Sequence, residues 1–378
     1  MERELLYQKV YNDLLQGIRD KTYPSGSRVP SEKELSEKYG VSRITSKKAL
    51  EMLADRGLIS RKPGKGSFVL GEAEMAAETG ARNTPAFGNL SGKRMIGVIF
   101  DDFSSSFGSD IIHGIEYECR KQNYNMVLKC TYGNVEEEAK AIEDLLAIGV
   151  DGIILLCVQG EIYNEKIIKL VLDKFPIILV DRELTGLPIP CITTDNYSAA
   201  KDLMQLLFEH DHTNICFLSH PYMQTSTVAA RFNGYLDSML ERGLPTNENM
   251  WIRDLGTVLP GASDGKCEKD MDLERIEQFI KENPQVTAFF AVDQTTGCMA
   301  YRVLRKLGLE KEKEIVFFDG IRESCDINPS FGCVIQGEYQ MGVKAVQYLH
   351  RCFEGEYVPQ KKTVPYTVVK GDYCRDNM

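Results

Sequence analysis

The sequence predicts an α/β protein with a small N-terminal domain and a larger domain built on parallel β-sheets. Residues 29–69 carry the signals of two short helices and a β-hairpin, whereas residues 94–378 alternate short apolar strands with amphipathic helices. Such alternation is typical of parallel sheets that are covered by helices on both faces. A chain of 378 residues, of which 43% are apolar and 26% charged, has the size and composition of two or three soluble globular domains.

The first element is an amphipathic helix predicted over residues 4–20. Its apolar residues recur on one face, as in a helix that packs against a core. The following stretch, residues 23–27, contains Pro and Gly and should end the helix. The apolar residues of the predicted face are Leu5, Val10, Leu14 and Ile18.

Residues 31–57 predict two short helices joined by a tight turn. Ser31, followed three residues later by Glu34, is a capping box, which places a helix start at Ser31. Gly40 should end this helix in the left-handed conformation, and Ser42 should cap the second helix. Two short helices around a glycine turn are typical of a helix-turn-helix. The residues of the second helix that we expect to pack inward are Ile44, Leu50 and Leu53.

The second helix is expected to expose cations and hydroxyls, which suit phosphate oxygens and base edges in a DNA groove. After it, LISRKPGKGSFV (58–69) predicts two strands around a turn at residues 62–66, which makes a hairpin wing with a basic tip. The alternative is a helical hairpin on the surface whose charged face is only solvated. The exposed residues expected on the helix are Arg43, Thr45, Ser46, Lys47 and Lys48.

This stretch resembles the GntR family of winged-helix regulators. The resemblance rests on Pro30-Ser31-Glu32 with Leu35, on Gly40-Val41-Ser42-Arg43 with Thr45, and on Gly64 to Val69. Arginine is common in the family where Lys33 and Lys47 stand. Because a lysine ammonium is a point charge and not a bidentate fork, we expect these two to bind phosphates and Arg43 to read a base. The DNA contacts that the resemblance implies are Lys33, Ser42, Arg43, Thr45, Lys47, Gly64, Lys65 and Gly66.

Charge is distributed unevenly along the chain. Residues 1–70 contain 14 Lys and Arg against 9 Asp and Glu, a net charge of +5, whereas residues 71–378 carry a net charge of −15. A basic head on an acidic body fits a DNA-binding domain of residues 1–70 and a separate domain of residues 94–378. Between them, residues 71–93 are rich in Ala, Gly, Asn and Thr and are predicted to form a flexible linker.

Several classes of protein are disfavoured by what the sequence does not contain. It has no run of about 18 apolar residues and no N-terminal signal region, so we expect a cytoplasmic protein. The 11 cysteines include no CxxC pair, which favours reduced thiols. His210 and His212 stand at i and i+2 and would not share a helix face, so we expect no metal site there. No cofactor motif or catalytic motif is present, and we expect no cofactor and no enzymatic activity.

Polar side chains follow several strands of the larger domain at the point where each strand ends. Because ligands of parallel sheets bind beyond the carboxyl ends of the strands, these side chains should face one site. Carboxylates, a guanidinium, an amide and aromatic faces together suit a polyhydroxylated ligand. The alternative is that each aspartate only caps the helix that follows. The strand-end residues are Asp101 to Phe107, Asp181-Arg182-Glu183, Asp293-Gln294 and Asp319.

Residues 95–370 resemble the family of LacI repressors and ribose-binding proteins. The matching motifs are Ile96-Gly97-Val98, Val150 to Ile154, Arg231 to Tyr235, Ala291-Val292-Asp293 and Phe318-Asp319. The resemblance implies a two-lobed, periplasmic-binding-protein-like domain with parallel sheets. The ligand-binding residues that it implies are Arg231, Asp293 and Gln336, with Asp101, Phe107, Arg182 and Asp319 as further members.

A GntR-type head before a LacI-type sensor resembles the arabinose-responsive repressors, which have the same order of domains. The resemblance implies a homodimeric repressor of a carbohydrate-utilisation operon that a monosaccharide, arabinose or another pentose first, releases from double-stranded operator DNA. Residues 103–110, rich in Ser, depart from the family pattern. The alternatives are an activator of the same architecture, a solute-binding receptor without regulatory output, and a glycosidase that uses the cleft carboxylates. The receptor would need an export signal and would have no basic head.

Overall fold

The computed structural model describes residues 6–20, 22–55, 58–62, 66–70, 93–103, 107–256, 259, 266–320 and 331–371. The chain divides into two compact units, residues 1–90 and residues 91–378. The predicted linker lies outside the described residues except for Lys93, and the predicted wing tip at Gly64 and Lys65 lies outside them as well.

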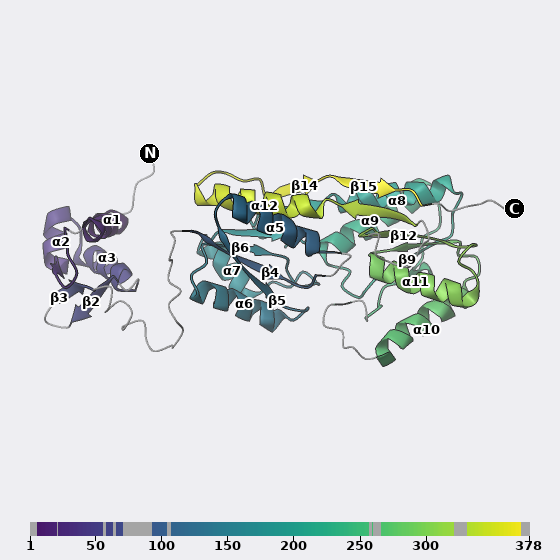
Figure 1. Cartoon of the computed structure of the whole chain (residues 1–378), viewed down its shortest axis with the longest axis horizontal. Coiled ribbons are helices and arrows are strands. Elements are labelled where there is room, and N and C mark those ends of the chain that lie inside the picture. The colour runs from purple at the N-terminus through teal and green to yellow at the C-terminus, as the bar shows by residue number, and fades with distance from the viewer. Residues whose placement is uncertain are drawn as a thin grey trace. The chain divides into compact units, whose positions relative to one another are not determined.

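The smaller unit is a three-helix domain with a short antiparallel sheet (Figure 1). Its helices are α1 (Leu6–Arg19), α2 (Glu32–Tyr39) and α3 (Arg43–Asp55), and its strands are β1 (Arg28–Val29), β2 (Ile59–Lys62) and β3 (Gly66–Val69). The strand order is β1-β3-β2, and β2 and β3 form the predicted hairpin with Lys62 opposite Gly66. The predicted helix-turn-helix and wing are therefore confirmed. The core includes Val10, Leu14, Leu35, Leu50 and Leu53, and the side chains of Leu5 and Ile44 lie outside the described set.

The first lobe of the larger unit is a six-stranded parallel sheet of order β14-β8-β7-β6-β4-β5. Helices α5 (Ser109–Lys121) and α12 (Glu338–Phe353) cover one face, and α6 (Val135–Ala147) and α7 (Glu165–Leu172) cover the other (Figure 1). The strands are β4 (Met95–Phe100), β5 (Asn125–Cys130), β6 (Gly152–Leu155), β7 (Ile177–Val180), β8 (Cys191–Thr194) and β14 (Lys361–Val364).

The second lobe is a sheet of order β10-β9-β11-β12-β13-β15, in which only β15 runs antiparallel to its neighbour. Helices α8 (Asn196–Glu209) and α9 (Ser226–Glu241) cover one face, and α10 (Lys266–Glu282) and α11 (Gln294–Leu307) cover the other. A 3-10 turn, η1 (Glu248–Met250), leads into β10. The strands are β9 (Ile215–Leu218), β10 (Trp251–Ile252), β11 (Ala288–Ala291), β12 (Glu314–Phe318), β13 (Gly332–Gln336) and β15 (Tyr366–Val369).

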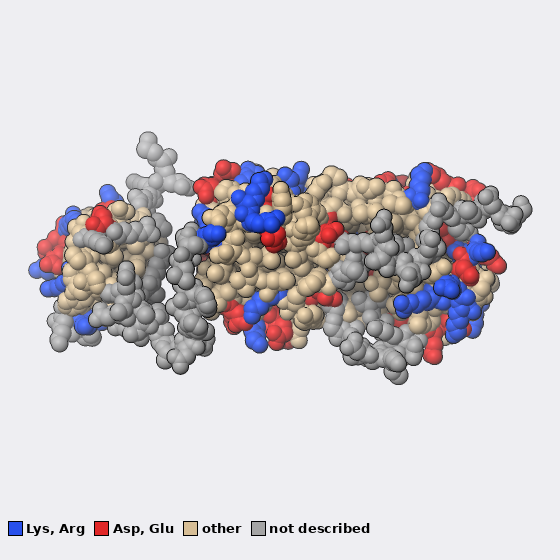
Figure 2. All heavy atoms as spheres, in the orientation of Figure 1, with Lys and Arg blue, Asp and Glu red and all other residues tan. Residues whose placement is uncertain are grey.

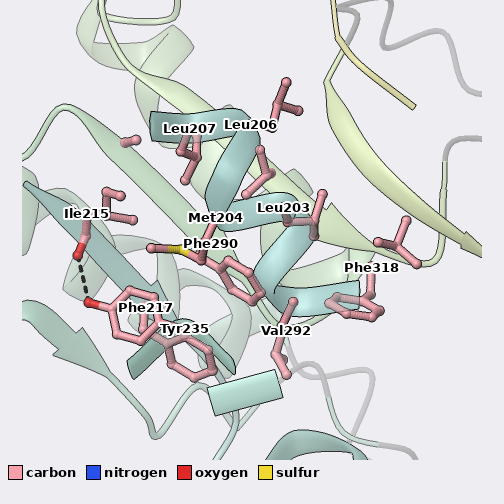
Figure 3. Packing of buried hydrophobic residues seen from close by; sticks show 14 of the residues in the cluster. Leu203, Met204, Leu206, Leu207, Ile215, Phe217, Tyr235, Phe290, Val292 and Phe318 are labelled. Carbon is pink, nitrogen blue, oxygen red and sulfur yellow. Dashed lines mark hydrogen bonds between the residues drawn. The ribbon is translucent and has the colours of Figure 1, made fainter. Parts of the chain in front are cut away.

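The core beneath α8 and α9 is rich in aromatic side chains (Figure 3). The rings of Phe217 on β9 and Phe290 on β11 are stacked with their centroids 5.5 Å apart. Tyr235 of α9 is buried beside them, and its hydroxyl donates a hydrogen bond to the carbonyl oxygen of Ile215 at 2.9 Å. Because a buried hydroxyl needs a partner, this bond fixes α9 on the sheet. This hydrogen bond and the aromatic packing thus anchor α9 on the sheet.

Three short segments of the described chain pass between the two lobes. They lie between β8 and α8, between β13 and α12, and between β14 and β15. At the second of these, a Cβ atom on Gly337 would lie 2.6 Å from the carbonyl oxygen of Pro365, in the third segment. Only glycine therefore allows these two segments to lie so close together. Lobes joined by a few short segments can hinge about them.

The strands that were predicted from their apolar runs are confirmed: β4, β5, β6, β7, β9, β11 and β12. Strands β8 (CITT) and β14 (KKTV) carry no apolar run, and β10, β13 and β15 were likewise not predicted as strands. Residues 254–270 carry no recognisable motif and are predicted from the sequence to be a surface insertion, whereas in the structure α10 begins at Lys266. No helix in the described part of the chain combines the length and the hydrophobicity that a membrane span requires.

Candidate nucleic-acid interface and ligand cleft

The helix-turn-helix is built by the caps that the sequence predicts. The backbone N–H of Glu34 donates to Ser31 Oγ at 3.3 Å, and the backbone N–H of Ser31 donates to Glu34 Oε2 at 2.6 Å. Gly40 ends α2 with φ of 61°, in the left-handed region. Ser42 begins α3, because its Oγ accepts a hydrogen bond from the backbone N–H of Thr45 at 3.2 Å. These local contacts fix the angle at which α3 leaves the turn.

The N-terminal half of α3 presents a polar surface. Arg43, Lys47 and Lys48 are exposed, and Thr45 is half-buried with its hydroxyl 2.9 Å from that of Ser42. The prediction that Ser46 is exposed was wrong: its side chain is 0% exposed, and its hydroxyl donates to the carbonyl oxygen of Ser42 at 3.4 Å. Ser46 stands on the same helix face as Leu50 and therefore points into the core.

Salt bridges hold the basic side chains around α3. Lys47 Nζ lies 3.7 Å from Glu51 Oε1, and Lys33 Nζ lies 4.0 Å from Glu37 Oε1, both at i, i+4 spacing on exposed helix faces. Arg61 on the wing strand β2 pairs with Glu32 of α2 and lies 3.6 Å from Glu51. Sequence reasoning did not single out Arg61, since nothing in the sequence brings β2 next to α2 and α3. Exposed pairs of this kind are weak, so a phosphate can compete for the cations.

The wing strand β3 starts at a glycine for a steric reason. Gly66 has φ of 110°, and a Cβ atom on it would lie 2.7 Å from Arg28 Nε. The positive φ favours glycine at this position, and a larger residue would also have to displace the exposed side chain of Arg28. Of the predicted DNA contacts, the described ones are Lys33, Ser42, Arg43, Thr45, Lys47 and Gly66, all in the α2-turn-α3 segment or the wing.

A polar cleft of about 190 Å³ lies between the two lobes of the larger unit. Five of the predicted ligand residues line it: Phe107, Arg182, Arg231, Asp293 and Asp319. Asp101 and Gln336 do not line it, and each instead holds a residue that does. The other residues of the lining are Asp102, Phe103, Gln159, Asp181, His220, Thr227, Val228, Val292, Gln294 and Thr295.

Arg231 of α9 is the most constrained of the lining residues. Its Nε donates to Asn196 Oδ1 at 2.8 Å and its Nη1 to the carbonyl oxygen of Val292 at 2.7 Å. The guanidinium lies over the ring of Phe318, 3.9 Å from the centroid. A planar cation that is held by two hydrogen bonds and an aromatic face is preorganised to donate to a ligand.

A second guanidinium is anchored in the first lobe. Arg182 Nη1 donates to Asp101 Oδ2 at 2.6 Å and to the carbonyl oxygen of Cys157 at 2.5 Å. Asp101 also accepts from the backbone N–H of Gly133 at 2.8 Å and is fully buried. Asp101 therefore orients Arg182 from behind and is a positioning residue.

Asp319 and Gln336 form the corresponding pair in the second lobe. Gln336 Nε2 donates to Asp319 Oδ1 at 2.6 Å. Burial raises the pKa of Asp319 to about 6, while Arg231 and the bond from Gln336 act in the opposite direction. Burial also raises the pKa of Asp181, with Arg231 and Arg182 opposing. For both carboxylates, burial thus outweighs the neighbouring charges and hydrogen bonds that favour the ionised form.

His220, at the carboxyl end of β9, was not predicted and lines the cleft. Burial lowers its pKa to about 4, with Asp293 acting in the opposite direction, so the ring is neutral near pH 7. The backbone N–H of Tyr222 donates to His220 Nδ1 at 3.3 Å, so the proton of the neutral ring resides on Nε2. His220 can therefore offer one hydrogen-bond donor to a ligand.

Asp293 caps a helix and also lines the cleft. Its Oδ1 accepts from the backbone N–H of Thr296 at 2.8 Å and so caps α11, and the same carboxylate lines the cleft.

Gln159 and His220 line the cleft but were not predicted. They follow β6 and β9, so the rule that selected Asp293 would have found them if it had been applied to every strand. Thr227 carried no comparable signal, because it lies inside a helix.

The lining contains more carboxylates than cations. Four aspartates face the cleft with two arginines, and one of the two, Arg182, is already paired with Asp101. The surplus of acceptors favours a neutral donor of hydrogen bonds over a phosphorylated ligand. Outside the cleft, Lys and Arg are interspersed with Asp and Glu on the visible face of the larger unit (Figure 2).

Two hydrogen bonds join the lobes at the rim of the cleft. The backbone N–H of Gly160 donates to Thr225 Oγ1, and that of Glu183 donates to Ser226 Oγ, both at 2.8 Å. Both donors belong to loops of the first lobe and both hydroxyls to the start of α9. Closure of the lobes is thus stabilised at one edge by the same helix that carries Arg231.

The two histidines of the His210-Asp211-His212 run bind a carboxylate. His210 Nδ1 lies 2.8 Å, and His212 Nε2 lies 3.0 Å, from Glu314 Oε2. His212 Nδ1 lies 2.9 Å from Thr287 Oγ1. The run therefore connects the turn before β9 to the start of β12 and helps to hold the sheet of the second lobe together.

A winged helix-turn-helix with exposed cations, carried by the same chain as a two-lobed polar cleft, defines a DNA-binding transcription regulator with a small-molecule sensor. Residues 93–324 match the periplasmic binding proteins and sugar binding domain of the LacI family, and residues 6–69 match the bacterial regulatory proteins of the gntR family. The chain belongs to the LacI-type family of sugar-binding domains and carries a GntR-type head.

Named relatives agree with this assignment. Catabolite control protein A of Priestia megaterium is 29% identical over 268 residues, which are 70% of this chain and 76% of that protein. The arabinose metabolism transcriptional repressor of Halalkalibacterium halodurans is 22% identical over 356 residues, 92% of this chain and 88% of that protein. The crystal structure of transcription regulator CcpA of Lactococcus lactis superposes with a TM-score of 0.64 at 18% identity, over 75% of this chain and all of that one, and shares the fold.

Proposed function

We propose that the protein is a sugar-responsive transcriptional repressor that acts in the cytoplasm. Its winged head binds a palindromic operator as a homodimer, and a neutral monosaccharide in the cleft releases it. The observation that carries the proposal is the cleft itself, in which Arg231 lies fixed over Phe318 and faces a surplus of carboxylates, in a chain that also carries a winged helix-turn-helix.

The DNA contacts that we propose lie on α3, the start of α2 and the wing. Arg43 is exposed at the N-terminus of α3, where a side chain reaches base edges, and it is the proposed base reader. Lys33 and Lys47 are exposed cations in weak salt bridges and are proposed to bind phosphates. The remaining proposed contacts are Ser42, Thr45, Gly64, Lys65 and Gly66.

The effector that we propose is a pentose, with arabinose as the first candidate. A cleft of about 190 Å³ exceeds the cavity of about 150 Å³ that binds benzene, so it has room for one six-membered ring. Asp181, Asp293 and Asp319 would accept from sugar hydroxyls, and Arg231 and neutral His220 would donate to them. The relative named as an arabinose metabolism repressor supports the choice of pentose.

Release from DNA follows in this proposal from closure of the lobes. A sugar that contacts Arg182 in the first lobe and Arg231 in the second lobe favours the closed form over the open one. The closed form holds the operator less tightly, and the coupling free energy needs to be only about 1–3 kcal/mol.

The test uses the full chain and two assays. Melting temperature is measured with a panel of pentoses, hexoses and sugar phosphates, and binding to DNA from the region upstream of its own gene is measured by fluorescence anisotropy with and without each sugar. We expect one neutral sugar to raise the melting temperature and to weaken DNA binding. A sugar that strengthened DNA binding would instead indicate an activator, and a response to sugar phosphates alone would contradict the proposed effector.

A further inference from the structure

A second polar cavity, of about 210 Å³, borders the first turn of α9. Its walls come from both lobes: Thr194 of β8 and Lys361 of β14 belong to the first lobe, and Ser226 and Ala230 of α9 belong to the second. Asp181 and Thr227 line both this cavity and the effector cleft. The two cavities are therefore neighbours with a shared wall.

Helix geometry shows that the second cavity is separate from the cleft. Residues three or four apart share a helix face. Ser226 and Ala230 line only the second cavity, whereas Val228 and Arg231 line only the cleft. The first turn of α9 thus stands between the two cavities. A ligand in the second cavity is a second molecule and not an extension of the first.

Two buried polar atoms at the second cavity lack a hydrogen-bond partner within the described chain. They are Asp181 Oδ1 and Thr194 Oγ1, in side chains that belong to residues only 4% and 2% exposed. Asp181 is also held at φ of 63°, in the left-handed region that non-glycine residues rarely adopt. Unpartnered buried polar atoms cost free energy, and they gather where a ligand completes the site.

The charges of the lining define what such a ligand must offer. Glu183 is neutralised by Lys361 at 2.8 Å, and the carboxylate of Asp195 accepts from the backbone N–H and the hydroxyl of Ser198. The capacity that remains is one acceptor, Asp181 Oδ1, and one hydroxyl, Thr194 Oγ1, which can donate or accept. Because the lysine of the described lining is already paired, a neutral molecule with hydroxyl groups is favoured over an anion.

We propose that this cavity is a second binding site for a small neutral polyhydroxylated molecule, a polyol or a cyclic sugar. Its volume exceeds that of the cavity of about 150 Å³ that binds benzene, so it accommodates a six-membered ring. Because its walls come from both lobes, an occupant favours the arrangement in which the lobes are together. That effect on the lobes rests on the proposed function of the cleft, whereas binding to the second cavity does not.

The experiment is isothermal titration calorimetry of the full chain with myo-inositol, xylitol and arabinose as probes. Ala230→Leu places a larger side chain in the second cavity, and Thr194→Val removes one unpartnered hydroxyl at nearly constant volume. Asp293→Asn is the matched control, because Asp293 lines only the cleft. We expect a probe whose affinity is unchanged in Asp293→Asn, at least about tenfold weaker in Ala230→Leu, and about fivefold weaker in Thr194→Val.

Thr194→Val should not lower the melting temperature, since it removes a hydroxyl that has no partner. If Ala230→Leu fails to fold, the affinity of Thr194→Val for the probe therefore tests whether the second cavity binds it. The proposal is overturned if no probe binds to Asp293→Asn at millimolar concentration. It is also overturned if Ala230→Leu and Thr194→Val both bind the probe as the wild type does. Displacement of the probe by KCl or NH₄Cl would overturn it too, because the cavity would then be a site for a monovalent cation. If Asp293→Asn changes no binding event, while Ala230→Leu and Thr194→Val still weaken one, the proposed cleft is contradicted and this site stands.

Discussion

The head and the sensor differ in how their functional residues come together. In the head, Ser42, Arg43, Thr45 and Lys47 stand within six residues of one another, and one cap fixes them. In the sensor, the cleft joins residues from position 102 to position 319 through two sheets and the segments between them. A contiguous site is thus specified by local backbone signals, whereas a dispersed one depends on the packing of both lobes. Substitutions in the two should therefore have separable effects.

The largest effect is expected from Arg231→Ala in the cleft. The change removes the donor over Phe318 and leaves Asn196 Oδ1 and the Val292 carbonyl unpaired. We expect sugar affinity to fall by about 100-fold, or about 3 kcal/mol, measured by calorimetry. DNA binding without sugar should be unchanged, with Lys47→Ala as the converse control. A parallel loss of DNA affinity in folded Arg231→Ala would show that the two sites are not separable.

A second test uses pH, because His220 and Asp319 have opposite shifts within one cleft. The lowered pKa of His220, about 4, makes the unfolded chain bind more protons between about pH 4 and 6.5, so its contribution to stability rises with pH. The raised pKa of Asp319, about 6, makes the folded chain bind more protons between about pH 4 and 6, so its contribution falls. Each amounts to at most about 3 kcal/mol across its window.

We therefore expect His220→Gln to make the free energy of unfolding of the larger unit fall more steeply with pH between about pH 4 and 6, and Asp319→Asn to make it rise more steeply. Urea unfolding can be followed by the single tryptophan, Trp251, which packs on Phe232 in the second lobe. Slopes that change in the same direction for both variants would contradict the assignment of these pKa shifts.

In the head, Arg43→Ala tests base reading. It should weaken operator binding by about 1–3 kcal/mol and leave binding to random DNA less affected, measured by anisotropy on both DNAs. Sugar affinity should not change. Equal losses on operator and random DNA would assign Arg43 to the phosphates instead.

The smallest effect is expected from Lys47→Ala. Loss of one phosphate contact should weaken all sequences alike and reduce the slope of log affinity against log salt by about 0.9. Lys48→Ala is a matched control, because Lys48 Nζ already lies over the Tyr7 ring, 4.2 Å from its centroid. A slope that Lys47→Ala leaves unchanged would place this side chain away from the backbone of the DNA.

The sequence predicted the head almost completely, since Ser31, Gly40 and Ser42 act on neighbours within three or four residues. Its one error there, Ser46, arose because a short polar residue in a helix was assumed to face solvent. In the sensor, strands with apolar runs were predicted, but β8 (CITT) and β14 (KKTV) were not, because their sequences contain no such run. Asp101 and Gln336 were predicted as ligand residues, and only the packing reveals that each stands one layer behind the cleft.

Helix α9 concentrates several tasks in its first turns. Thr225 and Ser226 join the lobes, Thr227, Val228 and Arg231 face the cleft, and Ala230 faces the second cavity. Residues 225–231 are encoded by seven consecutive codons. Mutations confined to these codons could therefore change which sugar is recognised. The mutational path between related regulators with different effectors is thus short, and a focused library over this stretch would sample much of it.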